Sequence, residues 1–334
     1  MSFMTKYGSV WSLLPQTTGR YFFVAPAASY TIEGVVYEAS NNNDGLSPER
    51  ALRTVAQAVT NATASVGDVI VLLGGAHSVS STVTINKAGL TIVGIPGSTP
   101  IAGARHNSGS KRLRTTITST ETAGIIFTVS ALDTEIAFIN FLPPAAGGRG
   151  ISITPTAGAT NGGRAYIHDC VFSMIATASV TTFGVTIPAG VTADLLEDTF
   201  ISKCLFISGT GASSGANGPA VNVLGTSHNT TLEYSTFELK GTAAWADAIL
   251  STNPGTLGTA IRDCDFHTPT SATTVMTDVI ELTGSTVDGS TQVYRCVFPL
   301  NSDAFQVTAV SDAMVADSYS AGDSATTNVL IGVV

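Results

Sequence analysis

The sequence predicts an all-β protein built as a parallel β-helix, and three observations carry this prediction. An apolar-x-x-apolar-x-aromatic pattern recurs six times, with Phe-to-Phe steps of 31, 34, 31, 29 and 32 residues. A second short run rich in Val, Ile and Thr lies between successive copies, and helical periodicity is almost absent after residue 66. Strands that return at this interval without helical crossovers indicate a coil of about seven or eight turns, not a doubly wound sheet.

The repeated pattern predicts an internal ladder and two strands in each period, one at the pattern and one between copies. Equivalent residues of successive coils stack at about 4.8 Å, so the second apolar position and the aromatic position are expected to point inward. The predicted ladder consists of Ile139, Phe141, Cys170, Phe172, Cys204, Phe206, Ser235, Phe237, Cys264, Phe266, Cys296 and Phe298. Two weaker copies are an earlier one at Leu90, Val93 and Ile95 and a degraded last one at Met314, Asp317 and Tyr319.

The region before the array is predicted to close one end of the coil, because an uncovered end exposes strand edges. Ser47 is the expected N-cap of a helix over 47–64, with Pro48 at its first position. Its expected apolar face consists of Leu52, Val55, Ala56, Val59 and Ala62. The expected division of the chain is an N-terminal arm or anchoring segment (1–46), a capping helix (47–66) and the β-helix (67–334).

The arm is rich in aromatic and apolar residues and is the candidate docking segment for a neighbouring protein. Its candidate interface residues are Tyr7, Trp11, Leu13, Leu14, Tyr21, Phe22 and Phe23. Packing of the same side chains against the coil, as an N-terminal extension of the core, is the alternative.

Charge and hydropathy exclude several partners. Charged residues make up 12% of the chain and the net charge is −9, so nucleic acid is not expected as a partner. The basic run, with Arg105, His106, Lys111, Arg112 and Arg114, is expected to be a solvated loop or an attachment site for an acidic partner. Neither an export signal nor a run long enough to cross a membrane is apparent, so the product is expected in the cytoplasm or released by lysis.

The four cysteines are expected to be reduced thiols in the core. Disulfides between neighbouring coils, Cys170 with Cys204 and Cys264 with Cys296, remain the alternative. Each cysteine stands alone in a C-x-F context, without the paired spacing of a zinc site. No metal and no cofactor are therefore expected.

Three consecutive segments carry a resemblance to a known class of proteins. NNNDGLSPERALRTVAQAV, VGDVIVLLGGAHSVSSTVTI and AGLTIVGIPG resemble the opening of right-handed, single-stranded parallel β-helices of the pectin-lyase-like class, and the likeness extends over roughly 40–300. KYGSVWSLLPQTTGRYFFVAPAASYTIEG resembles the start of uncharacterised β-helical proteins of tailed bacteriophages and prophages. The second resemblance implies a virion protein made in the host cytoplasm. A capsid-surface decoration or cement protein, bound as a homotrimer to the major capsid protein or other virion proteins, is expected in preference to a tail spike.

Pectin-lyase-like coils often cut polysaccharides, so the acidic residues require a comparison with catalytic sites. Asp263 and Asp265 form the best local pair, because alternation along one strand would put them on the same side about 7 Å apart. Asp169, Lys203, Tyr234, Asp263 and Arg295 share one column and are expected to form an outward polar face. His168, beside Asp169, is either a base or a structural residue.

We therefore expect no catalytic residue and no enzymatic activity. The alternative is a tail spike or fibre that binds or cleaves a host surface polysaccharide. That alternative predicts a groove with carboxylates from adjacent coils and aromatic side chains beside it. An exposed Trp245, Tyr234 or His267 would favour glycan binding.

Overall fold

The computed structural model contains one chain with three long parallel sheets and a short hairpin. It describes residues 17–96, 113–122, 124–144, 147–154, 164–174, 182–188, 198–208, 218–224, 230–239, 245–251, 260–267, 276–283, 292–298, 303–308, 314–316 and 319–320.

The strands fall into three parallel sheets, here named A, C and D, with ten, nine and eight strands among these residues. Sheet A pairs β1 (Tyr21–Val24), β4 (Val69–Leu72), β7 (Thr91–Gly94), β10 (Thr134–Ala137), β13 (Ala165–His168), β16 (Phe200–Ser202), β19 (Thr231–Glu233), β22 (Ala260–Arg262), β25 (Gln292–Tyr294) and β28 (Met314–Ala316). Sheet C pairs β5 (Gly75–Val79), β8 (Thr115–Ser119), β11 (Asn140–Leu142), β14 (Val171–Ser173), β17 (Leu205–Ile207), β20 (Thr236–Glu238), β23 (Asp265–His267), β26 (Val297–Phe298) and β29 (Tyr319–Ser320). Sheet D pairs β6 (Val83–Ile85), β9 (Ile125–Val129), β12 (Arg149–Ile153), β15 (Phe183–Ile187), β18 (Val221–Val223), β21 (Trp245–Ser251), β24 (Met276–Thr283) and β27 (Asp303–Thr308).

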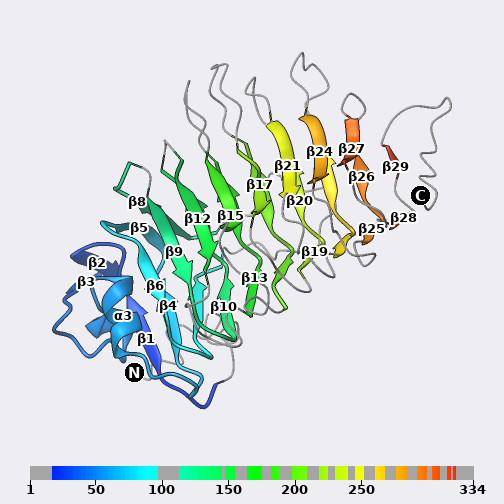
Figure 1. The fold of residues 1–334 in the computed structure, drawn as a ribbon. Coiled ribbons are helices and arrows are strands. Elements are labelled where there is room, and N and C mark those ends of the chain that lie inside the picture. The colour runs from blue at the N-terminus through cyan, green and yellow to red at the C-terminus, as the bar shows by residue number, and fades with distance from the viewer. Residues whose placement is uncertain are drawn as a thin grey trace.

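The chain visits the three sheets in turn, so it winds as a parallel β-helix. Each strand pairs with the strand three places later in the chain, as β10 does with β13 and β13 with β16. Figure 1 shows the strands side by side along one axis, from the N-terminal end in blue to the last strands in red. The predicted fold class is confirmed.

The predicted number of strands in each period is wrong: a coil holds three strands, not two. The apolar-x-x-apolar-x-aromatic pattern spans two strands that belong to different sheets, as Ile167 in β13 and Phe172 in β14 do. Between them lies a one-residue corner in the left-handed conformation. The corner residues and their φ angles are Phe138 (58°), Asp169 (52°), Lys203 (53°), Tyr234 (49°), Asp263 (53°) and Arg295 (53°).

The corner turns the chain from sheet A into sheet C without losing backbone hydrogen bonds. The Asp169 N–H donates to the Ser202 carbonyl at 3.2 Å, and the Lys203 N–H donates to the Glu233 carbonyl at 3.1 Å. The N–H groups of Tyr234 and Asp263 make the same bond to the next coil at 3.2 Å. Because the corner stays paired, a short turn can be repeated along the whole coil despite the cost of a positive φ for residues other than glycine.

The aromatic position of the pattern forms a continuous stack inside the coil. Rings of adjacent coils lie nearly parallel, with centroids 4.7 to 5.4 Å apart. The stack runs through Phe141, Phe172, Phe206, Phe237, Phe266 and Phe298, none more than 5% exposed. Gly150 and Gly184 leave room for it, because a Cβ atom there would come within 2.9 Å of the Phe172 and Phe206 rings.

The second apolar position forms a column of buried thiols, each free of a disulfide. The Cys170 Sγ donates to the Ile136 carbonyl and the Cys204 Sγ to the Ile167 carbonyl, both at 3.7 Å and both in the preceding coil. Burial raises the pKa of the Cys170 and Cys264 thiols well above the ordinary value. Ser235 keeps the column polar in one coil, where its hydroxyl donates to the Glu233 carbonyl at 2.9 Å.

The N-terminal end departs from the predicted arm. β1 pairs with β4 in register, so 21–24 form the first strand of sheet A and not a detached segment. Asp68 is 1% exposed and holds this strand in place by accepting hydrogen bonds from the backbone N–H groups of Arg20 and Thr63. Burial opposes ionisation, but these bonds and the Arg20 guanidinium lower the pKa of Asp68. An antiparallel hairpin of β2 (Ser29–Ile32) and β3 (Val35–Glu38) follows.

The capping helix is shorter than predicted. A 3-10 turn, η1 (Pro48–Arg50), follows Ser47, whose side chain makes no cap hydrogen bond. The α-helix, α3 (Val55–Asn61), begins after Thr54, whose hydroxyl accepts the Gln57 N–H at 3.2 Å. Leu52 forms a bridge with Val24 outside the helix, and Ala58, not the exposed Ala56, joins the buried face. That face still packs on the core at the N-terminal end of the coil (Figure 1).

The first and last copies of the pattern lie in another register than predicted. Ile92, not Leu90 or Val93, pairs with Ile136, and Ile117 and His77 continue the Phe column. At the other end Val315, not Met314, pairs with Val293, and Ser320 pairs with Phe298. The register of the first coil cannot be recognised in the sequence, because a long segment (95–114) separates β7 from β8 at the point where later coils have a one-residue corner.

Candidate functional site

The outer face of sheet A carries the side chains most able to do chemistry among the described residues. Two positions in each strand point away from the core and form two outer columns. The first column contains Glu135, Tyr166, Phe200, Thr231, Ala260 and Gln292. The second contains Ala137, His168, Ser202, Glu233, Arg262 and Tyr294. The corner residues run beside the second column.

His168 is held between two carboxylates. Its Nδ1 lies 2.9 Å from Asp169 Oδ2, and its Nε2 lies 2.9 Å from Glu135 Oε1. Burial alone would lower the pKa of His168, but the hydrogen bonds and charges of the two carboxylates raise it to about 9. The His168 hydrogen bond in turn lowers the pKa of Glu135 against the opposing effect of burial. His168 is therefore an imidazolium at neutral pH and has no lone pair to act as a general base.

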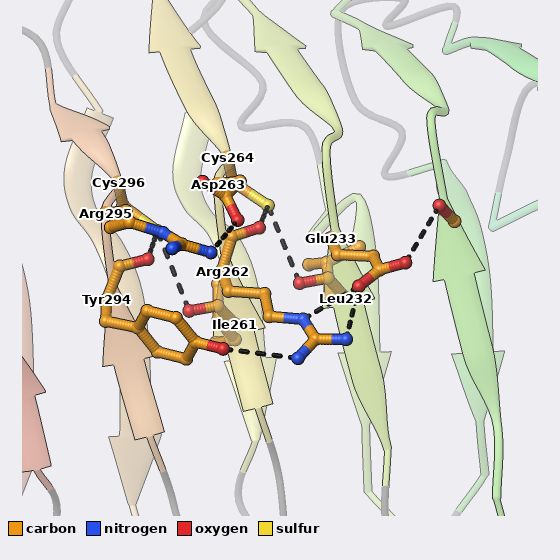
Figure 2. A network of polar contacts seen from close by, with 10 residues as sticks. Leu232, Glu233, Ile261, Arg262, Asp263, Cys264, Tyr294, Arg295 and Cys296 are labelled. Atoms are coloured by element: carbon orange, nitrogen blue, oxygen red, sulfur yellow. Dashed lines mark hydrogen bonds and ion pairs between the residues drawn. The ribbon is translucent and has the colours of Figure 1, made fainter. Parts of the chain in front are cut away.

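A second group of contacts links four successive coils (Figure 2). The Ser202 hydroxyl donates to Glu233 Oε1 at 3.3 Å, and Arg262 contacts Glu233 Oε2 through Nε at 2.7 Å and Nη2 at 2.6 Å. Arg262 Nη1 also donates to the Tyr294 hydroxyl at 3.2 Å. Hydrogen bonds to Tyr294 and Glu233 raise the pKa of Arg262. The guanidinium therefore bridges neighbouring strands as a permanent cation.

Asp263 and Asp265 do not form the expected pair on one face. The left-handed corner at Asp263 breaks the alternation, so Asp265 lies beyond the inward Cys264, in sheet C and not in sheet A. Asp263 and Asp265 are 5% and 3% exposed, and Asp263 lies 2.6 Å from Arg295 Nη2 (Figure 2). Carboxylates this buried cannot flank a polysaccharide. The five residues predicted to form an outward polar column, Asp263 among them, are the left-handed corner residues of successive coils.

A shallow depression of about 310 Å³ lies where β10, β13 and β16 begin. Its lining includes Asp133, Glu135, Arg164, Tyr166, Asp198 and Phe200. Tyr166 and Phe200 are 42% and 38% exposed. The sequence alone does not reveal this depression, because the spacing along the chain from Asp133 to Arg164 differs from the spacing from Arg164 to Asp198.

The predicted docking residues divide into two groups. Tyr7, Trp11, Leu13 and Leu14 lie outside the described residues. Phe22 and Phe23 are 2% and 3% exposed and Tyr21 is half-buried, so the expected docking role is wrong for the two phenylalanines. Their side chains point to opposite faces of β1, and each is buried in a different hydrophobic cluster, because the strand is covered on both faces.

Other candidates have mixed outcomes. Tyr234 is 51% exposed at its corner, His267 is half-buried in sheet C, and the side chain of Trp245 is outside the described part of the chain. Of the basic run only Arg114 is described. Within the described ranges no cluster of three or more possible metal ligands occurs, and no helix is long and apolar enough to cross a membrane.

Comparisons with known proteins bear on the fold. No protein-family model matches the chain, and no curated protein matches it. The solved structure of pectin methylesterase from Aspergillus niger, penultimately deglycosylated, is similar, with a TM-score of 0.53 and 13% identity over 94% of this chain and 89% of that one. The deglycosylated form of that enzyme gives a TM-score of 0.52 and 12% identity, over 92% and 87% of the two chains.

These matches show that the chain has the fold of a right-handed parallel β-helix, which is the fold that the resemblance implies. At 12% to 13% identity they establish the fold alone, so no activity follows from them. The structure of ORF18 of Geobacillus virus E2 is also similar, at a TM-score of 0.40 and 12% identity over 80% of this chain and 58% of that one. A likeness at that score carries no argument.

Proposed function

We propose that this protein is a non-enzymatic structural component of a tailed-phage virion, and that it decorates or cements the capsid surface. The observation that carries the proposal is the pairing of charges across successive coils on the outer face of sheet A. His168 is held by Glu135 and Asp169, and Arg262 by Glu233 and Tyr294. Contacts of this kind connect neighbouring coils and stabilise the β-helix. A stable, rigid β-helix suits a structural protein on the surface of a particle.

The resemblance of the N-terminal segment to tailed-phage proteins supports the virion assignment, and the charge composition supports the choice of partner. With a net charge of −9 and 12% charged residues, the chain suits a protein partner better than a nucleic acid. The proposed partners are the major capsid protein or other virion proteins, with no membrane contact. We propose a homotrimer, in which three coils pack side by side.

The test is to purify the particle whose genome carries this gene and to locate the protein by cryo-electron microscopy. Density on the head at many copies is the expected result, with three copies in each unit. Density at the tail tip in a few copies would overturn the decoration role. Light scattering on the purified chain gives the oligomeric state independently.

A tail spike or fibre is the second candidate function, and one observation favours its binding form. The depression between β10, β13 and β16 combines exposed aromatic rings with acidic side chains from adjacent coils. The cleaving form has less support, because Asp263 and Asp265 are buried. If the protein lies on the tail, polysaccharide incubated with the wild type and with Asp263→Asn and Asp265→Asn is expected to keep its chain length in all three.

A further inference from the structure

The depression at the start of β10, β13 and β16 is assembled from three successive coils in register. Thr134 pairs with Ala165, and Tyr166 pairs with Phe200. Counting back along these strands places Asp133, Arg164 and Asp198 in one column at the rim. Residues about 30 positions apart in the chain thus meet at one surface because the coil stacks them.

Tyr166 and Phe200 form an aromatic ledge in this depression. The two residues are register partners on adjacent strands, and 42% and 38% of their surfaces remain exposed. One side of the Tyr166 ring rests on the imidazolium of His168, with centroids 4.2 Å apart and planes 25° from parallel. Since Glu135 and Asp169 hold His168 from both nitrogens, the Tyr166 ring is fixed before any ligand arrives. Rigid, exposed aromatic rings of this kind serve as contact surfaces at low entropic cost.

The rim offers hydrogen-bonding groups beside the ledge. Arg164 contacts Asp133 through two bonds of 3.0 Å, Nε to Oδ1 and Nη2 to Oδ2, while 46% and 54% of the two side chains stay exposed. This planar pair keeps donors and acceptors toward solvent. Asp198 adds a carboxylate in the next coil. Three carboxylates, those of Asp133, Glu135 and Asp198, line the depression. They outnumber the two cations beside them, the Arg164 guanidinium and the His168 imidazolium, so an anionic ligand would meet like charge.

We propose that this depression binds a neutral pyranose glycan. The apolar CH face of a sugar ring packs on Phe200 and Tyr166, and its hydroxyls bond to Asp133, Arg164 and Asp198. The spacing of coils, about 4.8 Å, is close to the length of one pyranose unit, so successive sugars lie along successive coils. The balance of charge disfavours polyuronates. This inference rests on the binding form of the second candidate function and specifies its ligand class, and it does not depend on where in the particle the protein lies.

The test uses the purified full-length chain on an array of neutral oligosaccharides of glucose, galactose and N-acetylglucosamine, with oligogalacturonate beside them. Binding to at least one neutral series and none to oligogalacturonate is expected. Titration calorimetry then compares variants on the best probe. Phe200→Ala and Tyr166→Ala are expected to weaken binding about tenfold or more, through lost contact area. Phe200→Trp keeps the stacking surface and is expected to bind at least as tightly as the wild type.

The matched control is Tyr234→Asn, which removes an exposed aromatic ring outside the depression and suits a positive φ. It is expected to bind like the wild type. The proposal is overturned if no neutral oligosaccharide binds, if oligogalacturonate binds equally well, or if both alanine variants keep full affinity. Thermal unfolding of every variant shows that a loss of binding is not a loss of fold. A negative result leaves the virion role untouched, since the particle experiment tests that separately.

Discussion

The inside of the coil repeats one residue type from coil to coil, whereas the outer face of sheet A changes residue type from coil to coil. Inside, six phenylalanines stack in succession with nearly parallel rings. Outside, neighbouring coils place Glu135, Tyr166 and Phe200 in one column and His168, Ser202 and Glu233 in another. Six successive coils place a phenylalanine at the same inward position, so one packing solution serves these coils. Polar groups on the outer face need individual partners, so that face is where coils can differ and where binding specificity can arise.

The strongest test of this difference is to replace one phenylalanine inside the coil and one on its exterior by alanine. Phe206→Ala is expected to destabilise the fold by about 3–5 kcal/mol, because it opens a cavity between the rings of Phe172 and Phe237. Phe200→Ala, six residues earlier on the exterior, is the control and is expected to cost less than about 1 kcal/mol. Urea unfolding measures both, and equal effects would contradict the inward stack.

The outer face should also carry a pH dependence of its own, centred on His168. The folded-state pKa of His168 is about 9 and its ordinary value is 6.5. A raised pKa gives stability that is fully present below pH 6.5 and is lost as the pH rises through 9. The expected loss is on the order of 3 kcal/mol.

Urea midpoints of the wild type at pH 6, 8 and 10 check this prediction against His168→Gln. Other groups titrate in the same range, so the quantity of interest is the difference between the two proteins. That difference should shrink toward high pH. A constant difference would show that His168 is neutral in the folded state.

The corner between the two regions should respond to backbone conformation. Lys203→Ile is expected to destabilise the protein by about 1–2 kcal/mol, because a β-branched residue fits poorly at a φ of 53°. Lys203→Gly removes the same side chain but tolerates that φ, and is expected to unfold within about 0.5 kcal/mol of the wild type. Thermal melts of the two variants give the comparison. Similar losses in both would mean that side-chain contacts of Lys203, not its backbone, set the stability.

The smallest expected effect lies in the exposed part of the outer network. Tyr294→Phe removes the hydroxyl that accepts from Arg262 at 3.2 Å, and less than about 1 kcal/mol should be lost, since Arg262 is 36% exposed. Tyr294→Ala also removes the ring beneath the Arg295 guanidinium, 5.0 Å from its centroid, and should cost more. Equilibrium unfolding in low and high salt separates the two contributions.

The fold could be predicted because its packing repeats in the sequence. Each Cys or Phe of the ladder occupies a position with one neighbour above and one below, so the same residue type recurs and reveals the period. The corner could not be predicted, since Asp169, Lys203, Tyr234 and Arg295 share no residue type, and a left-handed φ normally points to glycine or asparagine. Because the corner cannot be recognised in the sequence, the pattern is interpreted there as one strand, although it spans two.

The candidate site was hidden for a related reason. Asp133, Arg164 and Asp198 meet only after the register of three coils is known, and the connecting segments differ in length from coil to coil. The tail-spike alternative predicts carboxylates from adjacent coils beside aromatic rings, and the depression contains both. The acidic pair considered from the sequence, Asp263 and Asp265, is instead separated by the corner. Likewise, Val55 and Val59 of the predicted apolar face lie on the buried face of α3, while the start of the helix depends on the Thr54 cap and not on Ser47.

The stacked corner and ring column make the length of this molecule adjustable in fixed steps. In the middle of the coil each turn offers its neighbours the same ring above and below, and the same backbone bond at the corner. Adding or deleting one period would lengthen or shorten the molecule by about 4.8 Å without altering the structure at either end. The distance between the two ends of the coil is therefore set by the number of periods in the sequence.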